Sequence, residues 1–404
     1  MRKSLFFVLI LASSYAGLAL APAPAAAVKA TPGVRPADTV SVVDYGATAD
    51  DATDDTAAIR AACVDAVARD LRVWVPRGKF ITSTLTIPDG TRILGVGRAS
   101  WLSGALRFGS DCSIRRLMLG SRQATLTLAP ARWSTHNIWV GSCRLRGGSP
   151  DWNGAIFHNG SGSVSDMTFN ACKFERNYGV RAPGVGAGAV MFFIDQRAGY
   201  DSVVSGIRIQ HCHFGVANGN GEIGQPTFNI VFCRSVEGSS GWFGGIEVVD
   251  NVFEAVGEFS LDFGQSGNGP YVPGHSDVLI RGNVIKGAGL GDPIWGYGIC
   301  TEPTHNGTVI EGNLIYRCQY TAIKLTKDTD DTIVRNNVID YREDNGVVLA
   351  HPSYHATIAI LEGCLRNTVT GNTIYLPPTP KADPATIENN GGSTNVITGN
   401  RIIQ

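Results

Sequence analysis

The sequence VVDNVF at residues 248–253 sets a pattern that returns five times before the chain ends. In each copy an apolar residue is followed three positions later by Asn, and two positions after that by Ile or Phe. The further copies are IRGNVI (280–285), IEGNLI (310–315), VRNNVI (334–339), VTGNTI (369–374) and ITGNRI (397–402). The asparagines are 24 to 35 residues apart. A repeat of this length is typical of a solenoid, in which each unit buries its apolar face against its neighbours.

Three cysteines extend this pattern toward the N-terminus. Cys212, Cys172 and Cys143 stand where Asn stands in the later copies, each two residues before a large apolar side chain. If the coils pair as strands, neighbouring positions lie about 4.8 Å apart, so Asn amides can hydrogen-bond along the stack and Cys can fill the same slot as a small buried side chain. The total of nine cysteines is odd, and this placement predicts free buried thiols in preference to disulfide bonds.

One stretch has a clear helical period. Between Asp54 and Asp70, one face carries Ile59, Ala62, Cys63, Ala66 and Val67. A strand follows at residues 73–76. The open end of a solenoid exposes core and unpaired backbone, so a short helix before the first coil would cover that end.

Segments beside this helix carry a family resemblance. The sequences VDYGA (43–47), DDTAAI (54–59) and VPRGKF (75–80) resemble the N-terminal capping segment of the pectate-lyase superfamily (pectin-lyase-like). The resemblance extends from about residue 41 to the end. It implies an all-β fold, a single-stranded right-handed parallel β-helix (a solenoid) with a short N-terminal capping helix. The superfamily includes lyases, glycoside hydrolases, epimerases and viral tailspikes, so the fold does not determine the activity.

The catalytic motifs of polygalacturonase-like members are missing from this chain. Asn-Thr-Asp, Gly-Asp-Asp, Gly-His-Gly and Arg-Ile-Lys do not occur. No catalytic residue is therefore transferred from that group, and the candidates below come from strand geometry.

The N-terminus has the pattern of a secretion signal. Arg2 and Lys3 precede an apolar run from Leu5 to Leu20, and three alanines at 25–27 suit a cleavage site. We expect a signal peptide at 1–27, a linker at 28–40 and one β-helix domain at 41–404, whose cap segment is 41–80. The protein is then secreted or periplasmic, and no other stretch is apolar enough for a membrane span.

Composition restricts the partners. The chain has 17% charged residues and a net charge of −1, or about −3 once Arg2 and Lys3 leave with the signal. A nucleic-acid binder that works through a basic face needs a surplus of Lys and Arg, so nucleic acid is excluded as a partner. The low charge also favours a weakly charged polysaccharide or oligosaccharide over a strongly anionic one.

The strands that follow the Asn positions form the wall on which relatives of this fold bind glycans. They read FSLDF (259–263), GICTE (298–302), AIKLT (322–326) and GVVL (346–349). Because side chains alternate between faces, Asp262, Cys300, Lys324 and Val348 share one outward column. Glu302 lies two residues further along. Steps of about 4.8 Å between coils and about 6.8 Å along a strand put the α-carbons of Asp262 and Glu302 about 8 Å apart.

Three functions fit this arrangement. An inverting glycosidase holds two carboxyl groups about 6.5–9.5 Å apart, one as acid and one as base, so Asp262 and Glu302 predict polysaccharide hydrolysis without a cofactor. Two solvated acids on a strand face would give the same pattern. A polysaccharide lyase could use Lys324 to remove the proton alpha to a uronate carboxylate, with Ca²⁺ as a cofactor; a surface salt bridge is the plainer role for Lys324. A non-catalytic glycan-binding surface protein could use the same wall.

Residues around the wall are candidates for sugar contacts. Long loops after the wall strands hold Trp242, Tyr271, His275 and Trp295, and Asp195 follows MFFI (191–194) in the outward column of Glu302. Flat aromatic faces stack on sugar rings, although Trp and Tyr also anchor long loops. His211 and His213 lie on one side of a strand, but no third ligand is close in sequence, so no metal site is predicted.

Overall fold

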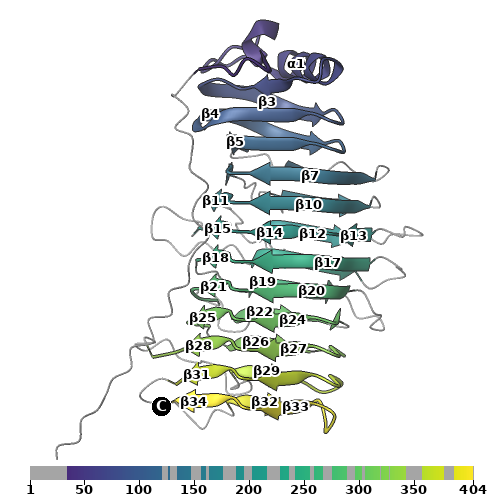
Figure 1. The fold of residues 1–404 in the computed structure, drawn as a ribbon, viewed down its shortest axis with the longest axis vertical. Coiled ribbons are helices and arrows are strands. Elements are labelled where there is room, and N and C mark those ends of the chain that lie inside the picture. Colours follow the sequence, from purple (N-terminus) through teal and green to yellow (C-terminus); the bar gives the residue numbers. More distant parts are fainter. Residues whose placement is uncertain are drawn as a thin grey trace, which may run out of the picture. The chain divides into compact units, whose positions relative to one another are not determined.

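The computed structural model describes residues 34–120, 126–127, 134–146, 156–160, 163–175, 188–194, 203–215, 228–235, 242–254, 259–266, 275–288, 296–302, 305–318, 320–326, 328–342, 357–376 and 386–403. One compact unit comprises Arg35–Gln404. Every strand pairing in its described residues is parallel, and each coil pairs with the coils before and after it. The unit is a parallel β-helix, as the repeat predicts. Figure 1 shows its coils stacked in chain order from α1 to β34.

The N-terminal elements close one end of this stack. They are β1 (Thr39–Ser41), the 3₁₀ helix η1 (Val42–Tyr45), α1 (Thr56–Ala68) and β2 (Arg72–Trp74). The helix confirms the predicted cap, and it buries Ile59, Ala62, Cys63 and Ala66. Val67 does not share this face, because its side chain is 41% exposed. The buried carboxylate of Asp55 accepts hydrogen bonds from the backbone N–H groups of Thr48 and Ile81, which ties the start of α1 to the first coil.

The unit begins earlier than residue 41. Arg35 donates a hydrogen bond to Asp44, and β1 pairs with β2 from Thr39 onward. Residues 35–40, expected as linker, therefore belong to the β-helix unit. The predicted signal peptide at 1–27 lies outside the described residues. In the part of the chain that the structure describes, no helix combines the length and the apolar character needed to cross a membrane.

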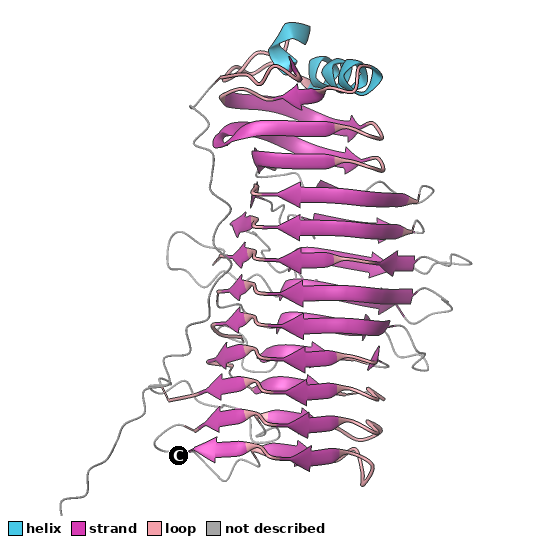
Figure 2. Cartoon of the chain, viewed as in Figure 1, coloured by secondary structure: helices cyan, strands magenta, loops and turns pink. Residues whose placement is uncertain are grey.

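Three walls run along the stack, and Figure 2 shows that strands make up most of each coil. Wall A contains the C-terminal parts of β3 (Gly78–Ile87) and β4 (Arg92–Phe108), then β6 (Leu126–Thr127), β9 (Ile156–Gly160), β12 (Gly188–Ile194), β16 (Phe228–Ser235), β19 (Phe259–Ser266), β22 (Tyr297–Thr301), β26 (Thr321–Leu325), β29 (Ile358–Ile360) and β32 (Ile387–Asn389).

Wall B contains β5 (Ser113–Leu119), β7 (Thr135–Gly141), β10 (Val164–Asn170), β13 (Val203–Ser205), β14 (Arg208–Gln210), β17 (Trp242–Val249), β20 (His275–Arg281), β23 (His305–Asn306), β24 (Val309–Glu311), β27 (Ile333–Arg335), β30 (Thr368–Thr370) and β33 (Val396–Thr398). Wall C contains β8 (Arg144–Arg146), β11 (Lys173–Glu175), β15 (His213–Phe214), β18 (Val252–Phe253), β21 (Val284–Ile285), β25 (Leu314–Tyr316), β28 (Val338–Asp340), β31 (Thr373–Tyr375) and β34 (Arg401–Ile403).

The repeated asparagines form a continuous ladder at the corner between walls B and C. The Nδ2 amide of each donates to the Oδ1 of the next, in the order Asn251, Asn283, Asn313, Asn337, Asn372 and Asn400. Each Nδ2 also donates to a backbone carbonyl of the preceding coil, as Asn283 does to Val248. The ladder therefore satisfies the buried backbone of a tight corner that recurs in every coil.

The cysteines continue the ladder with less hydrogen bonding. Cys212 donates its backbone N–H to the Oδ1 of Asn251, and its thiol lies 3.6 Å from the carbonyl of Phe169 in the preceding coil. Cys172 and Cys143 place their thiols against preceding-coil carbonyls in the same way. All three are buried and free, as are the other five cysteines whose surroundings are described. The prediction of free thiols is confirmed for these eight.

A left-handed residue precedes each of these corner positions. Gly282, Gly312, Gly371 and Gly399 have φ between 62° and 66°, which glycine adopts without strain. Asp250 and Asn336 fill the same place, and short polar side chains tolerate it best after glycine. A Cβ on Gly282 would come 2.2 Å from Oδ1 of Asp250 in the preceding coil. The glycines thus allow the corner to turn and let neighbouring coils approach.

Candidate functional site

Asp262 projects outward from the middle of β19. Its neighbours Leu261 and Phe263 are fully buried in the core, so alternation turns Asp262 to the other face. Asp262 pairs with Cys300, and Cys300 pairs with Lys324. The predicted outward column is therefore present in the structure.

Glu302 lies just beyond the end of β22, beside Gly264 of β19. Its backbone N–H donates to the carbonyl of Phe263 at 2.7 Å. A Cβ on Gly264 would lie 3.1 Å from Oδ2 of Asp262. The carboxylate of Asp262 therefore lies beside Gly264 of its own strand, which is the position next to Glu302 in the following coil. Because Gly264 has no side chain, nothing from that position separates the two acids, and both side chains are partly exposed.

Lys324 is buried, contrary to the exposed wall that the sequence suggests. Only 8% of the residue is accessible. Every residue of β22 and β26 is buried, so both faces of these two strands are covered. Its ammonium lies 4.3 Å from the centroid of the Tyr297 ring and donates a 3.2 Å hydrogen bond to the Tyr297 hydroxyl. Tyr297, Cys300 and Tyr320 pack together as a small apolar cluster separate from the main core. Each of the three is itself buried, so the outward face of wall A is not open to solvent at these residues.

The surroundings of Lys324 keep it protonated. Burial alone would lower its pKa. The interactions with Cys300 and Tyr297, the hydrogen bond to Tyr297 and a smaller contribution from Glu302 outweigh burial and raise the pKa of Lys324 above its usual value. A buried ammonium with a raised pKa is a fixed positive charge and a poor base at neutral pH.

Tyr297 is the residue of this site that sequence reasoning missed. Its spacing from Ile299 assigns it to the core face, yet its ring lies against Lys324 and Cys300. It is the first residue of β22, where the alternation of the strand begins. In the sequence, Tyr297 directly precedes the expected wall strand GICTE (298–302), and this aromatic residue was the signal that could have indicated a contact with the site.

The strand that pairs with β26 differs from the expected one. The sequence GVVL (346–349) was expected after AIKLT (322–326), and Val348 lies outside the described residues. The strand that pairs with β26 is β29, where Ala359 stands opposite Lys324. Ala359 thus takes the place in the outward column that was expected for Val348. The segments GVVL and TIAIL (357–361) are both short apolar runs, and only the pairing distinguishes them.

The sugar-contact candidates separate into two groups. Trp242 and His275 are the first residues of β17 and β20 on wall B, so they lie in strands and not in loops. The ring of Trp242 covers Gly244 of its own strand, because a Cβ there would lie 2.0 Å from the indole. Its side chain therefore lies along wall B and away from the acids. Asp195, Tyr271 and Trp295 lie outside the described residues.

His213 has a structural partner. Its Nε2 lies 3.1 Å from Oε1 of Glu254, which also accepts a hydrogen bond from Lys286. His211 sits at the corner with φ of 54°. In the described ranges, no group of three or more His, Cys, Asp or Glu side chains is arranged to hold a metal ion.

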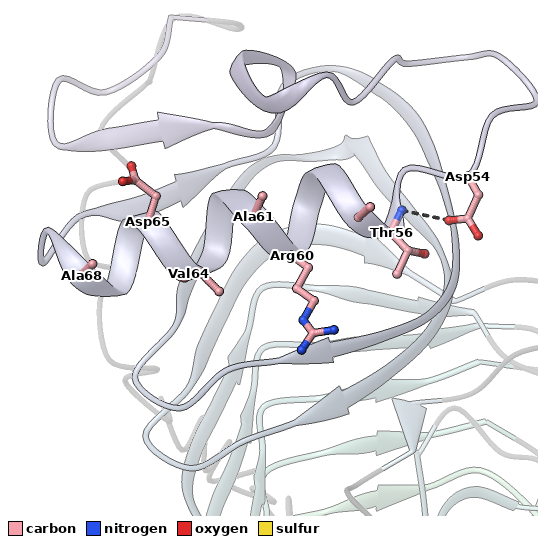
Figure 3. Close-up of a pocket in the computed structure, with 8 residues that line it drawn as sticks. Asp54, Thr56, Arg60, Ala61, Val64, Asp65 and Ala68 are labelled. Carbon is pink, nitrogen blue, oxygen red and sulfur yellow. Dashed lines mark hydrogen bonds between the residues drawn. The ribbon is translucent and has the colours of Figure 1, made fainter.

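A shallow hollow lies far from these acids, on the outer face of α1. It is lined by Ala57, Ala61, Val64 and Ala68, with Arg60, Asp54, Thr56 and Asp65 at its rim. Figure 3 shows Arg60 pointing from the helix toward the first coils, and the backbone N–H of Thr56 donating to Asp54 at the helix start. The polar groups do not converge on one point, and we assign no site there.

Two family models match the chain. Residues 39–145 match the model described as rhamnogalacturonase A/epimerase, pectate lyase-like, and residues 236–402 match the right-handed β-helix region. The chain is a pectate-lyase-like right-handed parallel β-helix. No curated protein sequence matches this β-helix.

Solved β-helix structures share its architecture. The surface adhesin PfbA of Streptococcus pneumoniae superposes with a TM-score of 0.57 and 15% identity, over 90% of this chain and 91% of the adhesin. The A-module of the Azotobacter vinelandii mannuronan C-5 epimerase AlgE6 gives 0.46 and 17%, over 90% and 99%. The GH87 α-1,3-glucanase of Streptomyces thermodiastaticus gives 0.45 and 14%, over 91% and 70%. The likeness to the adhesin establishes the fold alone.

Proposed function

We propose that this β-helix is an exported enzyme that cleaves glycosidic bonds of a polysaccharide by hydrolysis, with Asp262 and Glu302 as the catalytic pair. The proposal rests on the position of the Asp262 carboxylate. It lies beside Gly264, on the side of its strand that is nearer to Glu302 of the next coil. Two carboxyl groups on adjacent coils, with no side chain at Gly264 between them, can hold a glycosidic oxygen and a water.

The two acids take different roles. Glu302 is assigned as the base that activates water. Asp262 is assigned as the acid that protonates the leaving oxygen. Lys324 supplies a fixed positive charge beneath the site. Lys324 is a poor candidate for the base of a lyase, because its burial keeps a substrate from its amine and its ammonium is hydrogen-bonded to Tyr297.

Three variants test this assignment on a panel of extracellular polysaccharides. Asp262→Asn and Glu302→Gln should each lower the release of reducing ends by about a hundredfold or more, since a positioned acid or base contributes that much. Gly264→Val should also lower it, because its side chain fills the space between the carboxylates. Glu388→Gln is the matched control. Glu388 occupies the same outward column two coils beyond Lys324, and its removal should leave activity unchanged.

The products distinguish the alternatives. Hydrolysis gives saturated ends, whereas β-elimination on a uronate gives unsaturated ends that absorb in the ultraviolet. Unsaturated products, with activity lost in Lys324→Met, would refute hydrolysis in favour of the lyase. Binding of a glycan without any change in its chain length would leave the protein as a binding module. Full activity in either acid variant excludes the pair.

A further inference from the structure

Trp242 is the only aromatic residue among the exposed large apolar side chains of the described residues. It is the first residue of β17, and 36% of it is accessible. The next residue, Phe243, is fully buried in the core, so alternation turns Trp242 to the outer face of wall B. The acid pair belongs to wall A, so this tryptophan is not part of the proposed cleavage site.

The indole of Trp242 lies against its own strand. A Cβ on Gly244 would come 2.0 Å from the Cη2 and Cζ2 atoms of the ring. The six-membered ring therefore occupies the space in which a side chain at position 244 would stand, and Gly244 is buried beneath it. One side of the ring packs on the strand, and the other side is accessible to solvent.

A second tryptophan on wall B has the same arrangement with its outer side covered. Trp139 of β7 stands two residues before Gly141, as Trp242 stands two residues before Gly244, and its ring fills the space over that glycine in the same way. The guanidinium of Arg115 lies over the Trp139 ring, 4.1 Å from its centroid. Within the described residues, no guanidinium or ammonium lies over Trp242, so its outer face is available to a ligand.

Serine hydroxyls border the Trp242 ring on both neighbouring coils. Gly244 pairs with Ser205 of β13 in the preceding coil and with Ser276 of β20 in the following coil. Both serines are partly exposed, and each stands about 4.8 Å from the strand on which the ring lies. The hydroxyl of Ser276 donates to Oδ2 of Asp277 at 3.1 Å, so its oxygen can accept a hydrogen bond from a ligand. An aromatic face between two rows of hydroxyl groups combines the apolar and polar contacts that suit a sugar ring.

The charges on this part of wall B disfavour an anionic ligand. Asp277 of β20 and Asp166 of β10 are both exposed. Arg208 of β14 is paired with Glu247 of β17 at 3.4 Å, so this cation is already neutralised. Exposed carboxylates repel a polyanion, and the surroundings of Trp242 therefore suit a neutral sugar.

We propose that Trp242, Ser205 and Ser276 form a binding site on wall B for a neutral hexose or pentose unit of a polysaccharide. The C–H face of the sugar ring stacks on the indole, and its hydroxyl groups form hydrogen bonds with the two serines. The site goes beyond the cleavage proposed above, because it binds a glycan whether or not the chain cleaves it. In a chain that cleaves polysaccharides, it keeps a long substrate close to the enzyme.

Binding is measured with the full chain carrying Asp262→Asn and Glu302→Gln, so that no turnover interferes. The probes are dextran, mixed-linkage β-glucan, galactomannan and polygalacturonate, followed by affinity electrophoresis and tryptophan fluorescence. Trp242→Ala should weaken binding of a neutral probe about tenfold or more, because stacking and burial of the ring are lost, and should abolish the fluorescence change. Ser205→Ala and Ser276→Ala should each weaken binding about fivefold, because each removes one hydrogen bond.

Two further variants test whether the ring face is the cause. Trp242→Phe should retain part of the affinity, because a smaller aromatic face stays in place. Trp139→Ala is the matched control. It removes a ring that Arg115 already covers, and it should leave glycan binding unchanged. Circular dichroism verifies that each variant is folded before its binding is compared.

The outcomes separate this site from the cleavage proposal. With both acids intact, Trp242→Ala should raise KM for a long neutral polysaccharide and leave kcat unchanged. Binding that depends on Trp242 in a chain that cleaves no glycan would retain this site and refute the cleavage. Cleavage together with binding that is unaffected by Trp242→Ala would refute this site alone. Absence of binding to all three neutral probes, an equal loss in Trp139→Ala, or stronger binding of polygalacturonate than of any neutral probe would each overturn the proposal.

Discussion

Asn283→Ala removes one rung from the middle of the asparagine ladder. Asn283 is fully buried, and its side chain takes part in four hydrogen bonds. Its Nδ2 donates to Val248 and Asn313, and its Oδ1 accepts from the backbone N–H and the Nδ2 of Asn251. At about 1 kcal/mol for each hydrogen bond, the variant should lose about 4 kcal/mol of stability. That is a large part of the stability of an ordinary domain.

The ladder itself supplies two matched comparisons. Asn400→Ala removes three hydrogen bonds from a partly exposed rung in the last coil, and should cost about 1–2 kcal/mol because water can replace the lost partners. Asn283→Cys should fall between the two, since the thiol of Cys212 fills the same corner and contacts the carbonyl of Phe169 in the preceding coil.

Urea unfolding followed by far-ultraviolet circular dichroism gives the order of stability, and hydrogen exchange locates the loss. In Asn283→Ala, exchange should accelerate at the amides of the adjacent corners. If both variants cost under about 1 kcal/mol, the ladder is not a source of stability, and if Asn400→Ala costs as much as Asn283→Ala, burial does not set the contribution of a rung.

Two further predictions concern titrating groups. Burial raises the pKa of the Cys63 thiol to about 12 and that of the Cys112 and Cys364 thiols to about 11. Because all eight described cysteines are buried, a thiol reagent should leave them unmodified in the native protein and label them after denaturation. Rapid native labelling of these sites would contradict their burial. Burial alone would raise the pKa of Glu254, but hydrogen bonds from Lys286 and His213 outweigh it and lower the pKa. A depressed carboxyl pKa stabilises the fold above the unfolded value of about 4.3, and this stability is lost as the pH falls through the folded pKa. The melting temperature of the wild type should therefore fall more steeply than that of Glu254→Gln below about pH 4.3, and parallel curves would exclude Glu254 as a contributor.

The repeat was sufficient to predict the fold because its key residues form the contacts between coils. Asn251 and its equivalents bond to one another, and Asp262, Cys300 and Lys324 fall in register once the core positions are aligned. A second ladder, in which the backbone N–H of Thr332 donates to Asn367 and that of Asn367 donates to Asn395, went unrecognised because its first member is a different residue type.

The parts that could not be predicted depend on contacts distant in the sequence. The burial of Lys324 results from Tyr297 and its neighbours, and alternation alone places Lys324 on a face without showing what covers that face. Local pattern thus predicts the face on which a residue lies, and the tertiary packing determines its exposure.

The ladder of asparagines also gives the β-helix a polarity. From Asn251 to Asn400, each amide donates forward along the chain and accepts from behind, so the side-chain dipoles point the same way. Aligned hydrogen bonds polarise one another, which strengthens the interior rungs relative to those at the ends. A coil duplicated between Asn283 and Asn337 would therefore join a cooperative array, whereas one duplicated beside Cys172 would add a rung that transmits no such alignment.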